Sequence, residues 1–360
     1  MRVTQTMMAR QYTKRVSGSL GDLNYTNKQA GTGRKFFRGA ENPAGAAKAY
    51  QLRRQASQVN DYLSNLNEMQ SSLETKESSM TQVSKSLEDA YASLLGVMNG
   101  TENTTEVKQI VAQSFRSIQE TIVKDMNTKY GDKFIFGGGS VNTVPFDFRG
   151  NTLYYRGVDV SGFEDYTWPE DGSPNAGKKY LGLQSTDPAT GQPSTQVLEL
   201  LDQLSNDTIY TDLGFGLEFN GDKLISSSAY NSAIPGINVL GYGGTQDYPG
   251  NIVLTLGKMA QLLENDADVP SLDPYLGPFK EQKQRVLNAI TKTGSDSMFL
   301  DYTKNRLENL QDNIDNKIAD TEYIDAEEAI MHLNTIDYMY QALLKTSNKI
   351  LSNSFIDFMS

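Results

Sequence analysis

The sequence predicts a mainly α-helical fold with a β-rich insert between two helical ends. Three observations predict it: an apolar heptad pattern fills residues 59–97, a second fills the last 32 residues, and residues 141–249 are instead rich in Gly, Tyr, Asp, Ser and Pro. Sustained heptads indicate long helices that pack on one another. The simplest arrangement is an elongated helical rod made from paired N- and C-terminal segments, with an exposed middle β domain.

The first heptad pattern predicts a helix of about 40 residues, roughly 60 Å long at 1.5 Å per residue. Its steps alternate between three and four, and only one position is charged: the series is Val59, Tyr62, Leu66, Met69, Leu73, Lys76, Met80, Val83, Leu87, Ala90, Leu94 and Val97. Gly100 suits the end of this helix, and Thr104 or Thr105 suits the N-cap of the next. The second helix should fold back antiparallel on the first. One face of it carries Val111, Phe115, Ile118, Ile122 and Met126.

After residue 130 the sequence pattern changes from that of helices to that of strands and turns. The run "VPFDFRGNTLYYRG" (144–157) reads as a hairpin that turns at Arg149–Asn151, and "LGFGLEFNGDKLI" (213–225) reads as another with Asn220-Gly221 at its turn. The three glycines of "FGGGS" (136–140) are interpreted as a turn rather than an anion-binding nest. Residues 141–249 are therefore expected to form a mostly β, exposed module.

Helical patterns return in 251–266, 278–294 and 299–330. The C-terminal heptad series is Ala329, Leu333, Ile336, Tyr340, Leu343, Ser347, Ile350 and Ser354. Residues 1–30 carry only a sparse apolar stripe, at Val3, Met7, Val16, Leu20 and Leu23. Such a segment buries too little area to offset its ordering entropy, so we expect it to be disordered in a monomer and to fold against the last 32 residues and neighbouring subunits.

Composition excludes several classes of function. The net charge of −11 argues against nucleic acid and anionic membrane surfaces. The chain has no cysteine and a single histidine, His332, which removes thiolate chemistry, Cys-based zinc sites and His-clustered metal sites. The glycines of "GTGRK" lack the spacing of a nucleotide loop. We therefore expect no enzyme activity, no cofactor and no metal.

The first residues show no apolar segment typical of a cleaved secretory signal, and no run is long enough to span a membrane. The expectation from these rules alone is a chain without a cleaved signal and without membrane insertion.

Three stretches resemble the flagellin-like axial proteins of bacterial flagella. "AGTGRKFFRGAENPAGAAKA" (30–49) is similar to the Gly-turn and Asn-Pro-Ala segment near the start of flagellins. "KFIFGGGSVNTVPF" (133–146) followed by "NTLYYRG" resembles the hook-associated protein 3 family, which joins hook to filament. "TEYIDAEEAIMHLNTIDYMYQALLKTSNKILSNSFIDFM" (321–359) resembles the family's C-terminal helix. An acidic pair is commoner in the family where this chain has Arg38–Glu41.

The resemblance implies a non-enzymatic structural protein that leaves the cell through the flagellar type III apparatus and lies outside the cell in the flagellum. Its implied partners are hook-associated protein 1, flagellin, about ten further copies of itself in a ring of about eleven, and an export chaperone on the C-terminal helix. The alternatives within the class are flagellin and hook-associated protein 1.

Under this resemblance, residues 31–49 form a spoke between an inner pair of terminal helices and an outer rod that begins near Ala46. Gly31 and Gly33 allow chain reversal, and Asn42 caps a helix that starts at Pro43. Arg34, Lys35 and Arg38 are expected to contact acidic faces of neighbouring subunits. The assembly residues of the C-terminal helix are expected to be Leu333, Ile336, Tyr340, Leu343 and Ile350.

The predicted domains are residues 1–45 with 325–360, residues 46–140 with 250–324, and residues 141–249. An alternative of another class is a coiled-coil stalk adhesin with a β-rich binding head. In that case Tyr154, Tyr155, Tyr166 and Trp168 would form a carbohydrate-stacking face.

Overall fold

The computed structural model describes residues 5–100, 104–221, 223–225 and 228–356. The chain divides into two compact units. Unit 1 comprises residues 1–61 with 306–360, and unit 2 comprises residues 62–305. Two long helices, α2 (Pro43–Asn99) and α7 (Asp273–Glu322), contribute residues to both units.

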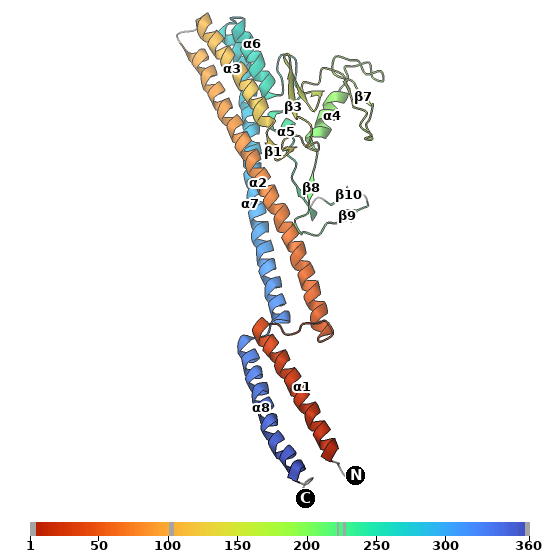
Figure 1. The fold of residues 1–360 in the computed structure, drawn as a ribbon. Helices are drawn as coiled ribbons and strands as arrows, with labels where there is room; N and C mark the ends of the chain where they lie inside the picture. Colours follow the sequence, from red (N-terminus) through yellow and green to blue (C-terminus); the bar gives the residue numbers. More distant parts are fainter. Residues whose placement is uncertain (1–4, 101–103, 222, 226–227, 357–360) are drawn as a thin grey trace. The chain divides into compact units, whose positions relative to one another are not determined.

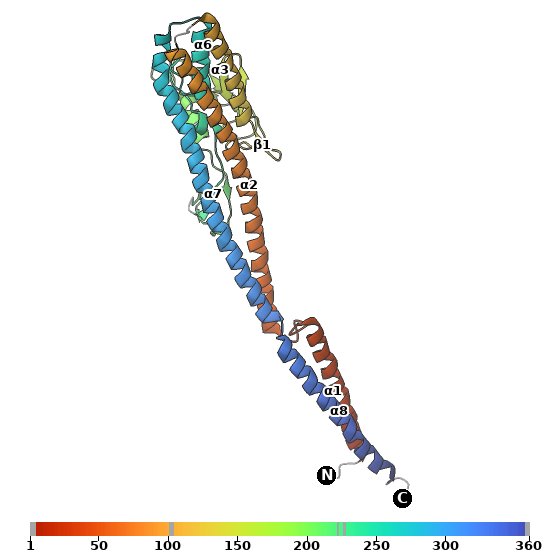
Figure 2. The same ribbon diagram turned by 90° about the vertical axis from the view of Figure 1, so that its left-hand side faces the viewer.

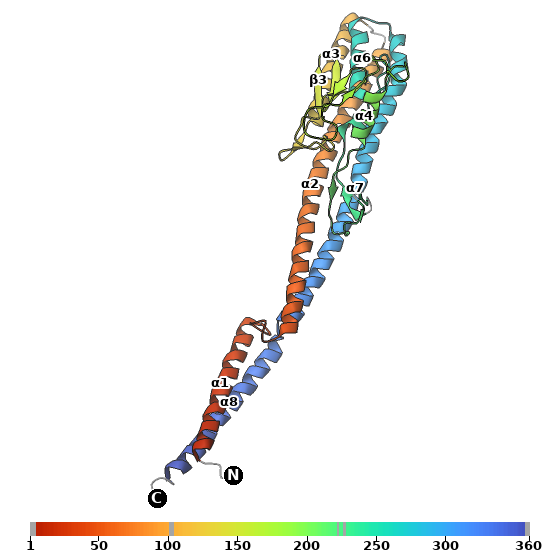
Figure 3. The same cartoon turned by 90° about the vertical axis from the view of Figure 1, so that its right-hand side faces the viewer.

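Unit 1 contains a pair of terminal helices that pack side by side, as all three ribbon views show (Figures 1, 2 and 3). These are α1 (Gln5–Thr32) and α8 (Ala326–Ile356). The predicted pairing of the first residues with the last 32 is therefore present. The inward positions differ in part from the predicted stripe: Val16 and Leu23 are half-buried, but Met7 and Leu20 are exposed. Val3 lies outside the described residues.

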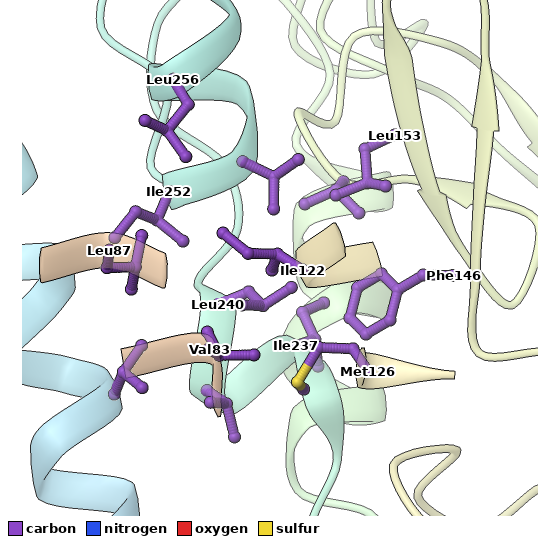
Figure 4. Packing of buried hydrophobic residues seen from close by; sticks show 14 of the residues in the cluster. Val83, Leu87, Ile122, Met126, Phe146, Leu153, Ile237, Leu240, Ile252 and Leu256 are labelled. Carbon is purple, nitrogen blue, oxygen red and sulfur yellow. The ribbon is translucent and has the colours of Figure 1, made fainter. Parts of the chain in front are cut away.

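Unit 2 is built on the predicted seam of α2. Every seam position from residue 62 to 97 is buried or half-buried, including Lys76. The next helix, α3 (Thr105–Met126), follows as predicted, with the Thr104 hydroxyl accepting from the Val107 N–H. It packs closely along α6 (Ile252–Glu264), and all three helices line one buried cluster together with strands and short helices of the middle region (Figure 4). Residues labelled there include Val83, Leu87, Ile122, Ile252 and Leu256.

The middle region contains short antiparallel strands, as predicted. The hairpin β3–β4 is in register, with Arg149 opposite Thr152 and Gly150 at a φ of 64°. Its partner strand β5 completes the sheet order β3-β4-β5. The further pairs are β1–β2, β6–β7, β8–β11 and β9–β10. The strands are β1 (Lys129–Tyr130), β2 (Lys133–Phe134), β3 (Phe146–Arg149), β4 (Thr152–Tyr155), β5 (Val158–Asp159), β6 (Tyr166–Thr167), β7 (Lys179–Tyr180), β8 (Tyr210–Thr211), β9 (Phe219–Asn220), β10 (Lys223–Leu224) and β11 (Tyr230–Asn231).

The middle region, predicted to be mostly β, also contains two helices that join the main cluster, α4 (Gln196–Ser205) and α5 (Gly236–Leu240). Two details of the predicted helices differ from the structure. The patterns at 278–294 and 299–330, given as separate runs, share one helix of 50 residues, α7, which follows the 3-10 helix η2 (Val269–Leu272). The helical run expected to continue from 299 to 330 is interrupted between Glu322 and Ala326.

Candidate assembly interface

Two connecting segments lie side by side and antiparallel within unit 1. One is the connection from α1 to α2, and the other is the connection from α7 to α8. Gly33, at a φ of 68°, ends α1, and its carbonyl accepts from the Ile324 N–H at 2.8 Å. The Lys35 N–H donates to the Glu322 carbonyl at 2.7 Å, so Arg34 and Tyr323 form an antiparallel β-bridge. The positive φ explains why glycine stands at position 33. Gly31, expected to help the reversal, instead lies inside α1.

The side chain of Glu41 organises the rest of the α1–α2 connection. Its Oε2 accepts from the Phe37 N–H at 2.8 Å and from the Tyr25 hydroxyl at 3.0 Å. The Phe37 N–H is the main reason that the pKa of Glu41 is lowered. Tyr25 meets the Phe37 ring edge-on at 5.7 Å between centroids, and the Lys28 ammonium lies 4.1 Å from that ring's centroid. The connection is therefore an ordered piece of structure.

The start of α2 follows the predicted capping chemistry. The Asn42 Oδ1 accepts from the Gly45 N–H at 2.9 Å, and Pro43 is the first helical residue. Proline is favoured there because its fixed φ suits a helix and its missing N–H would have had no helical partner. A few turns later Arg53 forms an ion pair with the buried Glu322 carboxylate. Helix α2 and the end of α7 are joined at this point.

The three basic residues singled out from the sequence have different environments. The Lys35 ammonium donates to the Asp320 carbonyl at 2.7 Å, so it is used within the unit. Arg34 and Arg38 are exposed, and neither forms an ion pair within the described part of the chain. Arg34 and Arg38 are therefore the residues of this connection whose guanidinium groups are exposed.

The predicted C-terminal seam faces α1. Leu333, Ile336, Tyr340 and Leu343 are half-buried, and the Tyr12 hydroxyl donates to the Leu343 carbonyl at 2.8 Å. The side chain of Ile350 lies outside the described residues. Two helices cover one side of each other only, so the seam residues keep part of their surface exposed.

Both helices also carry large apolar residues that are exposed. On α8 these are Ile330, Met331, Tyr338, Met339 and Leu344, and on α1 they are Met7, Met8 and Leu20. We call these residues the open faces. Tyr338 is 75% exposed and Met339 is 57% exposed. The sequence analysis named Met7 and Leu20 but none of the exposed residues of α8, although "AIMHLNTIDYMYQALL" has more apolar residues than a single seam needs.

The described part of the molecule gives little support for a metal site or for a helix that crosses a membrane. It has no group of three or more His, Asp or Glu side chains arranged to hold a metal ion. His332 is exposed on α8, 4.0 Å from the Glu328 carboxylate. None of the described helices is long and apolar enough to cross a membrane.

The four aromatic residues of the adhesin alternative do not form one exposed face. Tyr155 is fully buried and its hydroxyl donates to the Phe136 carbonyl at 3.0 Å. Tyr154 instead donates to Glu164, and Tyr166 meets Trp168 edge-on.

Comparisons with known proteins bear directly on this helical arrangement. Residues 3–140 match the family of the bacterial flagellin N-terminal helical region. The chain has a flagellin-like fold. It is similar to the solved structure of a putative flagellar hook-associated protein from Vibrio parahaemolyticus, with a TM-score of 0.56 and 15% identity over 79% of this chain and 100% of that one.

Two further solved structures are more distant from the flagellin-like chain. FlgL from Bacillus cereus has a TM-score of 0.46, 17% identity, and covers 75% of this chain and 99% of its own. The hook-associated protein-3 from Legionella pneumophila has a TM-score of 0.38, 13% identity, and covers 84% of this chain and 99% of its own. A comparison with curated protein sequences finds no match.

Proposed function

We propose that this flagellin-like chain is a non-catalytic structural subunit of the bacterial flagellum, located where the hook meets the filament. The flagellin N-terminal region and the fold support an axial role. The observation that carries the proposal is the pair of open faces on α1 and α8. Many large exposed apolar side chains on one pair of helices are typical of a surface that another chain covers.

The proposed partners follow from this role. Copies of the chain, about eleven in a ring, cover one another's open faces, with hook-associated protein 1 on one side of the ring and flagellin on the other. An export chaperone covers α8 before the chain leaves the cell by the flagellar type III route without a cleaved signal. Arg34 and Arg38 then face acidic groups of neighbouring subunits. The three-part division at residues 45, 140, 249 and 324 remains part of this proposal.

Filament growth tests the proposal. Flagellin is added to purified hooks that carry hook-associated protein 1, with and without this protein. We expect filaments only when it is present, and no filaments from this protein alone. Filaments from the protein alone would identify it as a flagellin, which is the second candidate because residues 3–140 match a flagellin region.

A matched pair of variants tests the open face. Tyr338→Asp places a charge at its most exposed tyrosine, and Asn334→Asp places the same charge on the exposed surface of the same helix. We expect Tyr338→Asp to abolish filament growth and Asn334→Asp to retain it. Equal activity of the two variants would rule out the open face as an assembly surface.

Arg34→Glu with Arg38→Glu should weaken assembly, and an unchanged yield of filaments would remove these arginines from the proposal.

A further inference from the structure

A surface cavity of about 550 Å³ lies in the middle region of unit 2. In Figure 1 the strands of this region stand to one side of α3 and α6. Both charged and aromatic side chains line the cavity: Asp147 and Arg149 come from β3, Arg156 from the turn between β4 and β5, and Tyr166 and Trp168 from β6 and its end. Sites for small ligands have volumes of about 300–1,000 Å³, so this cavity has room for such a ligand.

The aromatic wall of the cavity comes from β6. Tyr166 and Trp168 are two residues apart on an extended segment, so their side chains leave it on the same side. Their rings meet edge-on with centroids 6.1 Å apart, and both residues are half-buried. The Trp168 N–H donates to the Lys178 carbonyl at 2.9 Å, and its carbonyl accepts from the Gly177 N–H at 3.1 Å. Backbone hydrogen bonds and the neighbouring ring therefore hold Trp168 in place before any ligand binds.

The polar wall comes from β3. Phe146 and Phe148 pack on the core, so the alternate residues Asp147 and Arg149 turn outward together. The Arg149 Nε donates to the Asp147 carboxylate at 2.7 Å, and the guanidinium lies 4.8 Å from the centroid of the Tyr154 ring on β4. Within the described part of the chain, the terminal nitrogens of Arg149 and the second Asp147 oxygen form no further hydrogen bond. These groups are available to a ligand.

The turn between β4 and β5 adds a third charged residue, Arg156. Its φ is 53°, a left-handed conformation that residues other than glycine seldom adopt. Its N–H donates to the Pro145 carbonyl at 2.8 Å, and its guanidinium, only 16% exposed, pairs with Asp207. Backbone strain of this kind is concentrated at sites that hold ligands. The turn thus fixes a mostly buried guanidinium at the cavity.

The charges around the cavity balance one another. The charged residues that line it are two arginines and two aspartates, Arg149, Arg156, Asp147 and Asp171. Both arginines are already paired with a carboxylate, and Asp171 accepts from the Trp168 indole N–H at 3.1 Å. An anionic ligand would therefore find no unpaired cation among these residues. The matching ligand is uncharged, with one flat apolar face and a rim of groups that both donate and accept hydrogen bonds.

We propose that this cavity binds an uncharged saccharide, because a pyranose ring has C–H groups on its face and hydroxyls around its rim. The ring packs against Trp168, which buries apolar surface. Its hydroxyls donate to the Asp147 carboxylate and accept from the Arg149 guanidinium, and hydrogen bonds to charged groups are the stronger ones. This binding site is separate from the open faces of α1 and α8, so it adds a second property to the proposed structural role.

The fluorescence of Trp168 tests the proposal, since it is the single tryptophan of the chain and reports on this cavity alone. The full-length protein is titrated with the uncharged disaccharides lactose, maltose, cellobiose and N,N′-diacetylchitobiose, and with a sulfated form of each. We expect a saturable change with at least one uncharged disaccharide. Its sulfated form should bind about ten-fold more weakly, because the arginines are already paired.

A matched pair of variants tests the polar wall. Arg149→Ala removes a lining residue, whereas Lys179→Ala removes a similarly exposed residue of β7 that pairs with Asp165 and does not line the cavity. We expect the affinity for the saccharide to fall about ten-fold in Arg149→Ala and to stay at the wild-type value in Lys179→Ala.

Saturation-transfer NMR on the saccharide protons tests the aromatic wall. Trp168→Ala should abolish the transfer and Trp168→Phe should retain it, since phenylalanine keeps a flat ring. If Trp168→Ala does not fold, the comparison of Arg149→Ala with Lys179→Ala still decides.

Four results would overturn the proposal. They are no fluorescence change with any of these disaccharides, tighter binding of the sulfated forms, equal affinity of Arg149→Ala and Lys179→Ala, and undiminished transfer in Trp168→Ala. A fluorescence change that follows the concentration of the protein itself, with none on adding saccharide, would show instead that another copy of the chain fills the cavity.

Discussion

Two regions of the molecule, the α2 seam in unit 2 and the α8 seam in unit 1, bury the same kind of helix face to different depths. In unit 2, the seam residues Met80, Val83 and Leu87 of α2 are fully buried. In unit 1, Leu333 and Ile336 of α8 occupy corresponding heptad positions but are only half-buried. Unit 2 covers its seam with α3, α6, α7 and the middle strands, whereas the described part of α8 packs mainly on α1. A heptad pattern thus predicts which side of a helix turns inward, and other parts of the chain decide how completely it is covered.

The largest expected effect comes from truncating the fully covered seam. Leu87→Ala should lower the free energy of unfolding of unit 2 by about 3 kcal/mol, because it leaves a cavity in a packed core. Leu333→Ala should cost the monomer less than about 1 kcal/mol, since part of that side chain is already in water. Urea unfolding, followed by hydrogen exchange in α3 and in α8, measures both. Equal losses would show that the two units are covered to the same extent.

A smaller effect is expected from pH, through Lys76. Its folded pKa of about 8 lies below the usual lysine value of 10.5, so the unfolded state binds more protons between these values. Stability should therefore rise with pH across that interval, by about 2 kcal/mol between pH 7 and 9.5. Lys76→Met should lack this gain. A pH dependence of urea unfolding that is the same in both proteins would contradict the buried charge.

The cap of α2 should contribute less again. Asn42→Ala removes the acceptor of the Gly45 N–H and should cost about 1 kcal/mol of local stability in the first turn of α2. Asn42→Asp keeps an acceptor and serves as the control. Hydrogen exchange of residues 43–49 measures the effect. A similar exchange rate in the alanine and aspartate variants would show that the cap is unimportant.

The smallest effect should come from Glu41. Its folded pKa is lowered, so its stabilising contribution is present above the unfolded pKa and is lost as pH falls through the folded value. Acidification should therefore speed exchange of the Phe37 amide before it affects α2. Glu41→Gln should show that faster exchange already at pH 7. Exchange at Phe37 that does not depend on pH in the wild type, after correction for intrinsic rates, would exclude this role.

Much of the fold could be predicted because it depends on local periodicity. The α2 seam, the Thr104 and Asn42 caps and the two hairpin turns are each specified by residues close together in sequence. One difference lies at the end of the predicted run 278–294. A Cβ on Gly294 would meet nothing within 4 Å, so the position places no special demand on the backbone, and α7 continues through it.

The rest depends on contacts between distant residues. Helix α4 was not predicted, although "QVLELLDQLS" carries apolar residues at helical spacing. The segments around it are rich in Gly and Pro, and the whole region was therefore interpreted as mostly β. Lys76 was visible as the charged seam residue, but its acceptor at Ser232 is 156 residues away. The candidate interface was predicted in part, because its seam follows the heptads. The bridge between Arg34 and Tyr323 joins residues far apart in the sequence, and the open faces depend on how few elements surround α8.

The paired crossing in unit 1 has a mechanical consequence. A single connecting segment between two helices can rotate freely, because rotation about a few backbone bonds costs little. Here two connecting segments lie side by side and are joined by the Lys35–Glu322 and Ile324–Gly33 hydrogen bonds. Rotation of one segment therefore moves the other as well. Torque applied to the α1–α8 pair is thus passed on to α2 and α7 instead of being lost in a free joint.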